Sequence, residues 1–268
     1  MDSIWRRLPS SRVIDLAQPL HRGMPVSPNH PAFQLALMRR HGDMVRSDGG
    51  SAANEIIVTG GHVGTHIDAL AHVSHNGMLH GGVDPDSVQS NDGFAEMGID
   101  SVEPIVCRGV MLDVATLHDV DSLDAGYEVS VEDLEESERK AGVKVEAGDA
   151  VLIRSGWSRH WTDPEAFVGA EDGAPGPGES AAGWLAEREV RLAGAETIAF
   201  EVIAPGRGHA VLPAHRILLV ESGIHIIEVM NLSPLAESGA GEFGFIAAPL
   251  KLVGATGSPI RPLALIDV

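Results

Sequence analysis

Short apolar runs alternate with polar and glycine-rich segments along the chain, and most of these runs have the length of a β-strand. They are rich in Val, Ile and Leu, the residues that fill strands buried on one or both faces. The segments with this pattern are residues 12–18, 33–38, 54–59, 109–114, 149–155, 197–203, 224–230, 243–250 and 262–268. The pattern predicts a protein built mainly around a β-sheet.

Three other segments have apolar residues at helical spacing. Residues 130–142 open on Ser130 with Asp133 three positions later, which is an N-cap pattern, and they stop at a glycine. Residues 179–194 carry an apolar stripe and also end on a glycine. A shorter helix is expected over residues 213–222.

The order of these elements indicates the fold class. Strands outnumber helices and the two do not alternate regularly, which favours an α/β fold with a mixed β-sheet core flanked by helices over a Rossmann fold. Residues 169–180 are too rich in Gly and Pro for regular structure. We expect them to form a surface loop or an active-site lid rather than a linker, because strand-forming sequence continues on both sides. Residues 1–268 are therefore interpreted as a single domain.

Composition and charge exclude several classes of partner. The chain has 268 residues, of which 44% are hydrophobic and 21% charged, and its net charge is −19. Because this charge repels phosphate and no Lys/Arg cluster stands out, we expect neither a nucleic-acid partner nor a membrane partner. No apolar run approaches the roughly 18 residues that span a bilayer, and the N-terminal residues 1–12 lack a hydrophobic signal core. A cytoplasmic location is expected. The single cysteine, Cys107, excludes an internal disulfide and is interpreted as a small buried hydrophobe.

Potential metal-ligating residues are concentrated in residues 60–82, "GGHVGTHIDALAHVSHNGMLHGG", which hold five of the thirteen histidines. Within it, His62, His66, Asp68 and His72 follow the pattern H-x3-H-x-D-x3-H. Imidazole and carboxylate are ligands that Zn²⁺ and Mn²⁺ accept. The alternative is a histidine-rich surface loop without a metal. We interpret the spacing and the small intervening residues as half of a metal site.

Two local structures bring these side chains together. If the segment is extended, His62, His66 and Asp68 share a parity and point the same way, and Gly64 leaves room between them. The following residues can begin a helix that places His72 one turn after Asp68. Three protein ligands leave a coordination position open for water, whose pKa the metal lowers. His72, close by but not needed as a ligand, would then serve as general acid–base.

Weaker candidates lie elsewhere. His75 and His80 are expected to be solvated or to edge the pocket. Aromatic and basic side chains beside the Gly/Pro-rich segment and in the "PGRGH" turn could line a substrate pocket. The substrate-binding candidates are Trp157, His160, Arg207 and His209.

Several segments of the chain resemble motifs of a known family. "HVGTHIDALAH" is similar to the H-x-G-T-H-x-D-x-P-x-H signature of the metal-dependent cyclase family, which includes bacterial kynurenine formamidases and isatin hydrolases. "VIDLAQPLHRGMPVSPNHPAF" resembles the family's opening segment. "PAHRILLVESGIHIIEVMNLSPL" resembles its second histidine–glutamate segment, and "GFIAAPLKLVGATGSPIRPLALI" its closing motifs. The resemblance covers nearly the whole chain and implies a swivelling β/β/α-like fold.

The resemblance also implies roles for the first cluster. His62, His66 and Asp68 would be metal ligands, and His72 the catalytic histidine. Three positions depart from the family's pattern: Leu70 stands in place of the proline after Asp-Ala, Val73 in place of a phenylalanine, and Ser27 in place of an aromatic residue. These departures would leave the ligands intact, and we expect them to change the substrate pocket by weakening an aromatic platform for a substrate ring.

The second segment would complete the site. The resemblance assigns Glu228 to the metal and His215 to catalysis, while in formamidase-like members both positions serve a second metal bridged by the aspartate. His225 has the opposite parity to Glu228, so a strand cannot direct both at one metal.

Together, the residues and the resemblance lead to one functional hypothesis. We expect a metal-dependent hydrolase that cleaves an amide-type C–N bond, in a formamide or a cyclic amide, with metal-activated water. The cofactor would be Mn²⁺ or Zn²⁺, one or two per chain, and the partners a small-molecule substrate and further copies in a homodimer or homotetramer. The alternatives are a lactone or ester hydrolase, a polyketide-type cyclase and, less favoured, a metal- or ligand-binding protein without turnover.

Overall fold

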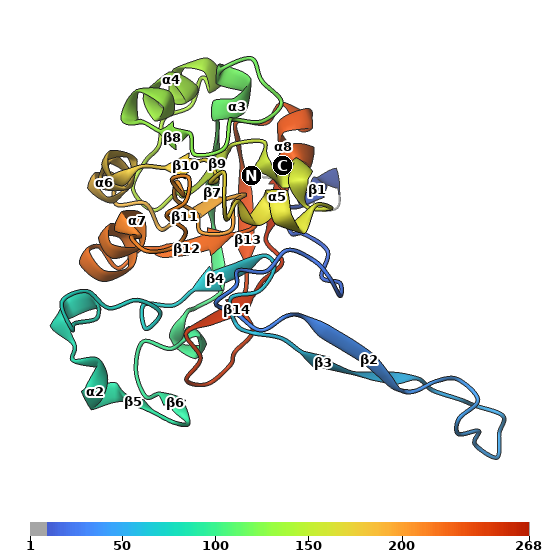
Figure 1. Cartoon of the computed structure of the whole chain (residues 1–268). Helices are drawn as coiled ribbons and strands as arrows, with labels where there is room; N and C mark the ends of the chain where they lie inside the picture. The colour runs from blue at the N-terminus through green and yellow to red at the C-terminus, as the bar shows by residue number, and fades with distance from the viewer. Residues whose placement is uncertain (1–9, 268) are drawn as a thin grey trace, which may run out of the picture.

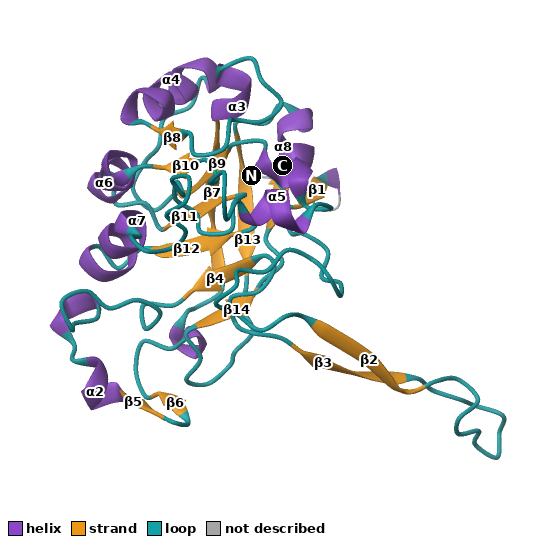
Figure 2. Ribbon diagram, viewed as in Figure 1, coloured by secondary structure: helices purple, strands orange, loops and turns teal. Residues whose placement is uncertain are grey.

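A nine-stranded mixed sheet forms the centre of the computed structural model, which describes residues 10–267 (Figures 1 and 2). In sheet order the strands are β1 (Arg12–Asp15), β15 (Leu263–Ile266), β13 (Glu242–Ala247), β7 (Ile105–Asp113), β9 (Ala150–Arg154), β11 (Leu192–Ala195), β12 (His225–Glu228), β4 (His66–Asp68) and β14 (Gly257–Pro259). The four strands from β7 to β12 run parallel to their neighbours within that group, and the remaining pairings are antiparallel. The predicted α/β fold with a mixed sheet is confirmed.

Three smaller two-stranded sheets surround the central one. They pair β2 (Gln34–Arg39) with β3 (Asn54–Val58), β5 (Gln89–Ser90) with β6 (Gly93–Phe94), and β8 (Glu128–Val129) with β10 (Gly176–Pro177). The α-helices are α2 (Pro85–Val88), α3 (Val114–Leu117), α4 (Val131–Ala141), α5 (Pro164–Val168), α6 (Glu179–Glu187), α7 (Pro213–His215) and α8 (Ser233–Ser238). The 3-10 helical turns are η2 (His80–Gly82), η3 (Ile99–Ser101) and η4 (Trp157–His160), and η5 (Arg216–Glu221) is π-helical.

The central sheet buries side chains on both faces, and the period of two along its strands decides which face each residue serves. In β9, Val151 and Ile153 pack with Leu134 of α4 and Leu185 of α6 in one core cluster. The intervening Leu152 packs into a second cluster on the opposite face. Continuous apolar runs in β7 and β9 therefore reflect strands covered on both sides.

Eight of the predicted strands overlap observed ones, but the strand expected over residues 197–203 is wrong. This segment is a buried turn in which Phe200 has a φ of 59°. The strand in this part of the chain is β11 (Leu192–Ala195), which lies just before the turn. The sequence pattern places these residues at the end of the helix expected over residues 179–194. Gly194 explains the error: an added Cβ would lie 2.6 Å from the Met230 sulfur, so this central strand needs small residues that do not signal a strand.

The helix expected over residues 179–194 is present as α6 over residues 179–187, and the other two helix predictions are confirmed. The helix expected over residues 130–142 is α4, where Ser130 and Asp133 form a reciprocal capping box and Gly142 ends the helix in the left-handed conformation. The helix expected over residues 213–222 is present as α7 followed by η5.

The Gly/Pro-rich segment is not a surface loop along its whole length, because residues 173–178 are buried. Gly176 lies directly on the buried turn: a Cβ there would be 2.4 Å from the carbonyl carbon of Glu201. Glycine is needed here for close approach of two main chains. The segment thus holds the 197–203 turn in place.

Two sequence-based expectations concern the chain's environment. Among the described residues, no helix is both long and apolar enough to cross a membrane. Most of residues 1–12, considered above for a signal sequence, lie outside the described residues, as does residue 268. Cys107 is half-buried on β7 rather than fully buried.

Candidate metal centre

Two short antiparallel strands bring the first and second histidine-containing segments together. In β4, His66 and Asp68 face one side while Ile67 between them is fully buried in the core. Glu228 of β12 lies directly opposite His66 in the register. His215 comes from the last position of α7. Residues about 150 positions apart in sequence are thus neighbours in one buried cluster.

His62 reaches the cluster from a turn rather than from the strand. Residues 61–65 are not extended, and Gly64 has a φ of 69°. The expected role of Gly64 as space between ligands is wrong, because a Cβ there would meet the Leu20 side chain at 2.2 Å. Gly257 of β14 provides the space instead: its added Cβ would lie 2.4 Å from the His62 ring.

His72 lies on a turn and not on the helix that was expected after Asp68. No helix follows β4, and the chain turns sharply, with the His72 amide donating to the Ala69 carbonyl at 3.0 Å. The turn still places His72 beside the cluster, with its ring stacked on that of His62 at a centroid distance of 3.8 Å.

The donor atoms form two groups that share Asp68. One consists of His62, Asp68 and His72, and the other of Asp68, His215 and Glu228; in each, one ligand atom per residue lies within 4.8 Å of the others. His66 lies against both carboxylates, with Nε2 3.6 Å from Asp68 and 3.3 Å from Glu228. All six predicted site residues therefore meet in one place. The assignment of individual residues to metal or catalysis stays a prediction.

Buried oxygens in the cluster fit a cation. Asp68 Oδ2 and Glu228 Oε1 are buried and accept no hydrogen bond from the described residues. His215 Nε2 approaches them no closer than 3.7 and 3.2 Å. An unsatisfied buried carboxylate oxygen is costly, and a divalent metal bound by imidazole and carboxylate would remove that cost. The donor set therefore fits the Zn²⁺ or Mn²⁺ expected from the sequence.

Neighbouring charges shift the pKa values of the buried groups. Burial would lower the pKa of His66, but its hydrogen bond to Glu228 and the carboxylate charges raise it to about 9. Burial opposes protonation of His215 as well, yet Glu201 and Glu228 raise its pKa to about 10. Burial would raise the pKa of Asp68, but the surrounding imidazoles hold it far below its usual range. Without a metal, the protonated imidazoles of His66 and His215 therefore supply positive charge beside the buried carboxylates.

Burial lowers the pKa of His72 to about 4, against the opposing effect of Asp68. This histidine is therefore neutral at physiological pH. A neutral imidazole can either accept a proton or ligate a metal.

Glu201 supports the cluster and was not singled out in the sequence. It is fully buried and accepts hydrogen bonds from the main-chain amides of Ala214 and His215 at 2.8 and 3.0 Å. Its Oε1 also lies 2.7 Å from His215 Nδ1, which leaves Nε2 directed at the carboxylates. The available signal was a glutamate within the apolar run "TIAFEVI", because a carboxylate buried among apolar residues needs a partner.

A cavity of about 300 Å³ opens onto the cluster. Besides the cluster itself, polar and apolar side chains line it: Ser27, Asn29, His30, Val73, Ile198, Ala199, His209 and Leu212. His30, also missed in the sequence, stacks on His62 at 5.4 Å. Two of the three family departures, Ser27 and Val73, are wall residues.

The weaker candidates divide between this cavity and other surfaces. His209 lines the cavity, with Nδ1 3.4 Å from the Ser27 hydroxyl. Trp157 and His160 instead line a different cavity of about 660 Å³ that none of the six cluster residues lines. Arg207 is exposed and is not among the residues that line the cavity at the cluster. His75 is exposed and His80 donates to the Val220 carbonyl, so neither reaches the cluster.

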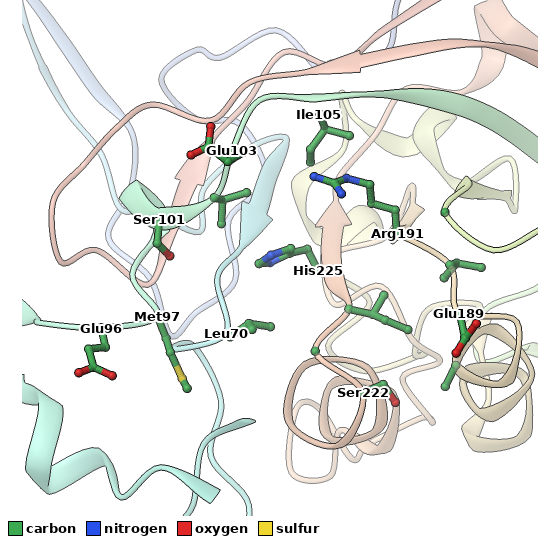
Figure 3. Close-up of a pocket in the computed structure, with 16 residues that line it drawn as sticks. Leu70, Glu96, Met97, Ser101, Glu103, Ile105, Glu189, Arg191, Ser222 and His225 are labelled. Carbon is green, nitrogen blue, oxygen red and sulfur yellow. The ribbon is translucent and has the colours of Figure 1, made fainter. Parts of the chain in front are cut away.

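His225 points away from the cluster, as its parity predicts. Its Nδ1 lies 2.8 Å from the main-chain carbonyl of Asp68. Figure 3 shows its ring at a separate cavity of about 950 Å³, which Leu70 and Arg191 also line. Leu70, the third departure, is therefore not part of the wall at the cluster.

Comparison with known proteins adds independent information. The profile of a family described as putative cyclase matches residues 14–202. An isatin hydrolase of Roseibium aggregatum is 29% identical over 223 residues, which are 82% of this chain and 77% of that protein. A kynurenine formamidase of Sphingopyxis alaskensis is 26% identical over 260 residues, 94% of this chain and 97% of that protein. A crystal structure described as a novel cyclase superposes with a TM-score of 0.86 at 29% identity, covering 97% of this chain and 88% of that one.

Metal binding should release protons. Because His66 and His215 have raised pKa values of about 9 and 10, both are protonated at pH 7 and must lose their protons to bind a cation. Calorimetric titration of Mn²⁺ or Zn²⁺ in two buffers of different ionisation enthalpy should show this release. The affinity should rise from pH 6 to pH 9 and level off above about 10. Affinity independent of pH over this range would contradict the assignment.

Asp68→Asn should remove metal binding from both donor groups at once, because Asp68 is common to them. We expect the affinity for the metal to fall by more than about 100-fold. Loss of a residue that only supports a ligand costs about 10–100-fold, so a larger loss would indicate a direct ligand. Asp133→Asn is the matched control, since Asp133 is also buried beside a histidine, His118, but lies outside the cluster. Metal content after dialysis, measured by mass spectrometry, should fall only in the first variant.

Proposed function

The chain belongs to the putative cyclase family, and from that membership we propose that it is a metal-dependent hydrolase of amide-type C–N bonds, in a formamide or a cyclic amide. The observation that carries the proposal is the buried cluster in which Asp68 is shared by two groups of metal-ligating side chains. The names of the two relatives point to the same bond: isatin is a cyclic amide, and a formamidase cleaves a formamide. The cytoplasmic location expected from the sequence stays a prediction.

The cluster would supply the cofactor site. Asp68 and Glu228, with imidazoles of the cluster, would hold Mn²⁺ or Zn²⁺, and the sharing of Asp68 supports two ions per chain. A divalent cation there lowers the pKa of a water molecule and polarises the substrate carbonyl. Glu201 orients His215 through Nδ1, and the Gly64 carbonyl does the same for His66 at 2.8 Å.

His72 is proposed as the residue that moves the proton. It lines the cavity, and its low pKa leaves the ring neutral and able to accept a proton from the attacking water. The same residue would then return that proton to the leaving nitrogen. His62, stacked beneath it, is held from both ring nitrogens, by Asp68 at 2.7 Å and Thr256 at 2.9 Å. This fixed ring keeps His72 over the cluster.

The size of the cavity favours a compact substrate. Its volume of about 300 Å³ is at the low end for small-molecule sites, which span about 300–1,000 Å³. Val73, Ile198, Ala199 and Leu212 give it apolar walls, while His30 and His209 offer polar groups at its edge. This mixture suits a small amide held by a few directed hydrogen bonds.

The protein should hydrolyse amides when loaded with metal. A panel of N-formyl-kynurenine, isatin and simple lactones, each with added Mn²⁺ or Zn²⁺, tests the bond class. We expect turnover of at least one amide and loss of activity with a chelator. Turnover of lactones alone would replace the amide hydrolase by a lactonase, and the absence of any metal-dependent turnover would contradict the proposal.

His72→Ala should separate catalysis from metal binding. Removal of a general base costs about 10²–10⁴-fold in rate, so kcat should fall by that factor while the metal content stays at the wild-type level. His75→Ala is the control, because His75 is exposed and outside the cavity. Parallel loss of metal and rate in His72→Ala would show that this residue is a ligand.

A further inference from the structure

A second cavity, of about 950 Å³, lies at the opposite end of β12 from the metal cluster. Glu228, the last residue of β12, belongs to the cluster, whereas His225, the first residue of that strand, lines this cavity. Arg191, which immediately precedes the neighbouring β11, lines it as well. The two ends of β12 are only about 10 Å apart, because a strand rises about 3.3 Å per residue. We name this space the rear cavity.

His225 offers the rear cavity a hydrogen-bond acceptor. Its Nδ1 lies 2.8 Å from the main-chain carbonyl of Asp68, and because a carbonyl oxygen can only accept, Nδ1 carries the proton. In the neutral ring, Nε2 is then an acceptor. No group of residues 10–267 donates a hydrogen bond to this nitrogen. A ligand with an N–H or O–H group can therefore bind here.

Arg191 offers the same cavity a positive charge. Its side chain is exposed and forms no ion pair with a carboxylate of residues 10–267. It is close enough to act on His225, whose pKa is lowered by burial and also by the charge of Arg191. In Figure 3 the Arg191 side chain extends toward the side of the cavity that holds the His225 ring. An unpaired guanidinium can bind a carboxylate through two parallel hydrogen bonds.

The remaining wall limits the size and charge of a ligand. Much of it is apolar: Leu70, Met97, Val102, Ile105, Val190 and Ile224. Three exposed glutamates also line the cavity, and Figure 3 shows two of them, Glu96 and Glu189, at opposite margins. The third is Glu103. Because these negative charges disfavour a ligand with several carboxylates, the rear cavity fits a monocarboxylate with an apolar body and one hydrogen-bond donor.

We propose that the rear cavity binds the ring-opened product of the reaction, a molecule that carries one carboxylate and one amine on an apolar body. The inference rests on the proposed function and narrows its substrate to a cyclic amide. Hydrolysis of a cyclic amide adds one water across the C–N bond: the carbonyl carbon becomes a carboxylate and the nitrogen becomes an amine of the same molecule. A formamide would instead give formate and a separate amine. The carboxylate would pair with Arg191, and an amine N–H would donate to His225 Nε2.

Occupation of the rear cavity would act on the metal cluster through one hydrogen bond. A donor at His225 Nε2 strengthens donation from Nδ1, because hydrogen bonds in a chain polarise one another. The acceptor of that bond is the carbonyl of Asp68, the residue common to both groups of metal-ligating side chains. Bound product would therefore hold Asp68 in place and strengthen metal binding. Coupling between two sites is reciprocal, so the metal should raise the affinity for the product by the same factor.

Calorimetric titration of the full chain with 2-aminobenzoate tests the site. This probe carries a carboxylate and an adjacent amine on an apolar ring, whereas benzoate lacks the amine and aniline lacks the carboxylate. Each of these two should bind at least about 10-fold more weakly, because one hydrogen bond to Arg191 or His225 is lost. Arg191→Gln should weaken binding of 2-aminobenzoate by at least about 10-fold for the same reason. Added Mn²⁺ should raise the wild-type affinity by roughly 5-fold or more.

Arg12→Gln is the matched control. Arg12 is an exposed arginine of β1, an edge strand of the sheet, and lines neither the rear cavity nor the cavity at the metal cluster. This variant should bind 2-aminobenzoate as the wild type does. Both arginines are exposed, so both variants should keep the wild-type near-UV circular dichroism. Wild-type affinity in Arg191→Gln would place the probe at another site, and absence of binding to the wild type would overturn the proposal as well.

The inference and the proposed function can fail separately. Turnover of a cyclic amide without binding that depends on Arg191 would overturn the product site and leave the hydrolase in place. Binding that depends on Arg191, in a protein that hydrolyses no cyclic amide, would overturn the assignment of the ligand as product. An affinity for 2-aminobenzoate that Mn²⁺ does not change would overturn the coupling through His225.

Discussion

The buried pair of carboxylates, Asp68 and Glu228, is the constraint on which the site depends. They are 0% and 5% exposed and lie within reach of the same imidazoles. Two negative charges cannot remain in a poorly solvated place without compensating positive charge. In the metal-free protein that charge comes from protons on His66 and His215, whose pKa values are raised to about 9 and 10. A divalent cation can supply the same charge and satisfy the two oxygens that accept no hydrogen bond.

The fold meets this constraint with short, tightly packed elements near one edge of the sheet. β4 contributes three residues between β12 and β14, and two of the three face the cluster while Ile67 anchors the strand in the core. Gly257 makes room for the His62 ring, and the buried turn that follows β11 supplies Glu201 behind His215. Rigid supports of this kind would keep the proposed ligands in position for a metal.

The sequence predicted what local pattern encodes and missed what packing encodes. Alternation and capping located most strands and α4. The histidine spacing pointed to His62, His66, Asp68 and His72, and the family resemblance added His215 and Glu228. β11 was missed because it contains Gly194, a residue that seldom signals a strand and that is required here by the close approach of Met230 and Leu152, which are distant in sequence. His30 was missed for a similar reason: a single histidine in a loop carries no signal until the fold stacks it on His62. β2 and β3 have the sequence pattern of ordinary strands, and only the structure shows that their apolar side chains are exposed.

Anomalous diffraction from crystals grown with Mn²⁺ or Zn²⁺ tests the central claim most directly. The account predicts an anomalous peak about 2.0–2.3 Å from an Asp68 carboxylate oxygen, with Glu228 or a cluster histidine completing the coordination. A second peak on the other side of Asp68 would establish two ions per chain. Metal-loaded crystals with no peak at Asp68, or with the only peak elsewhere in the molecule, would contradict the account.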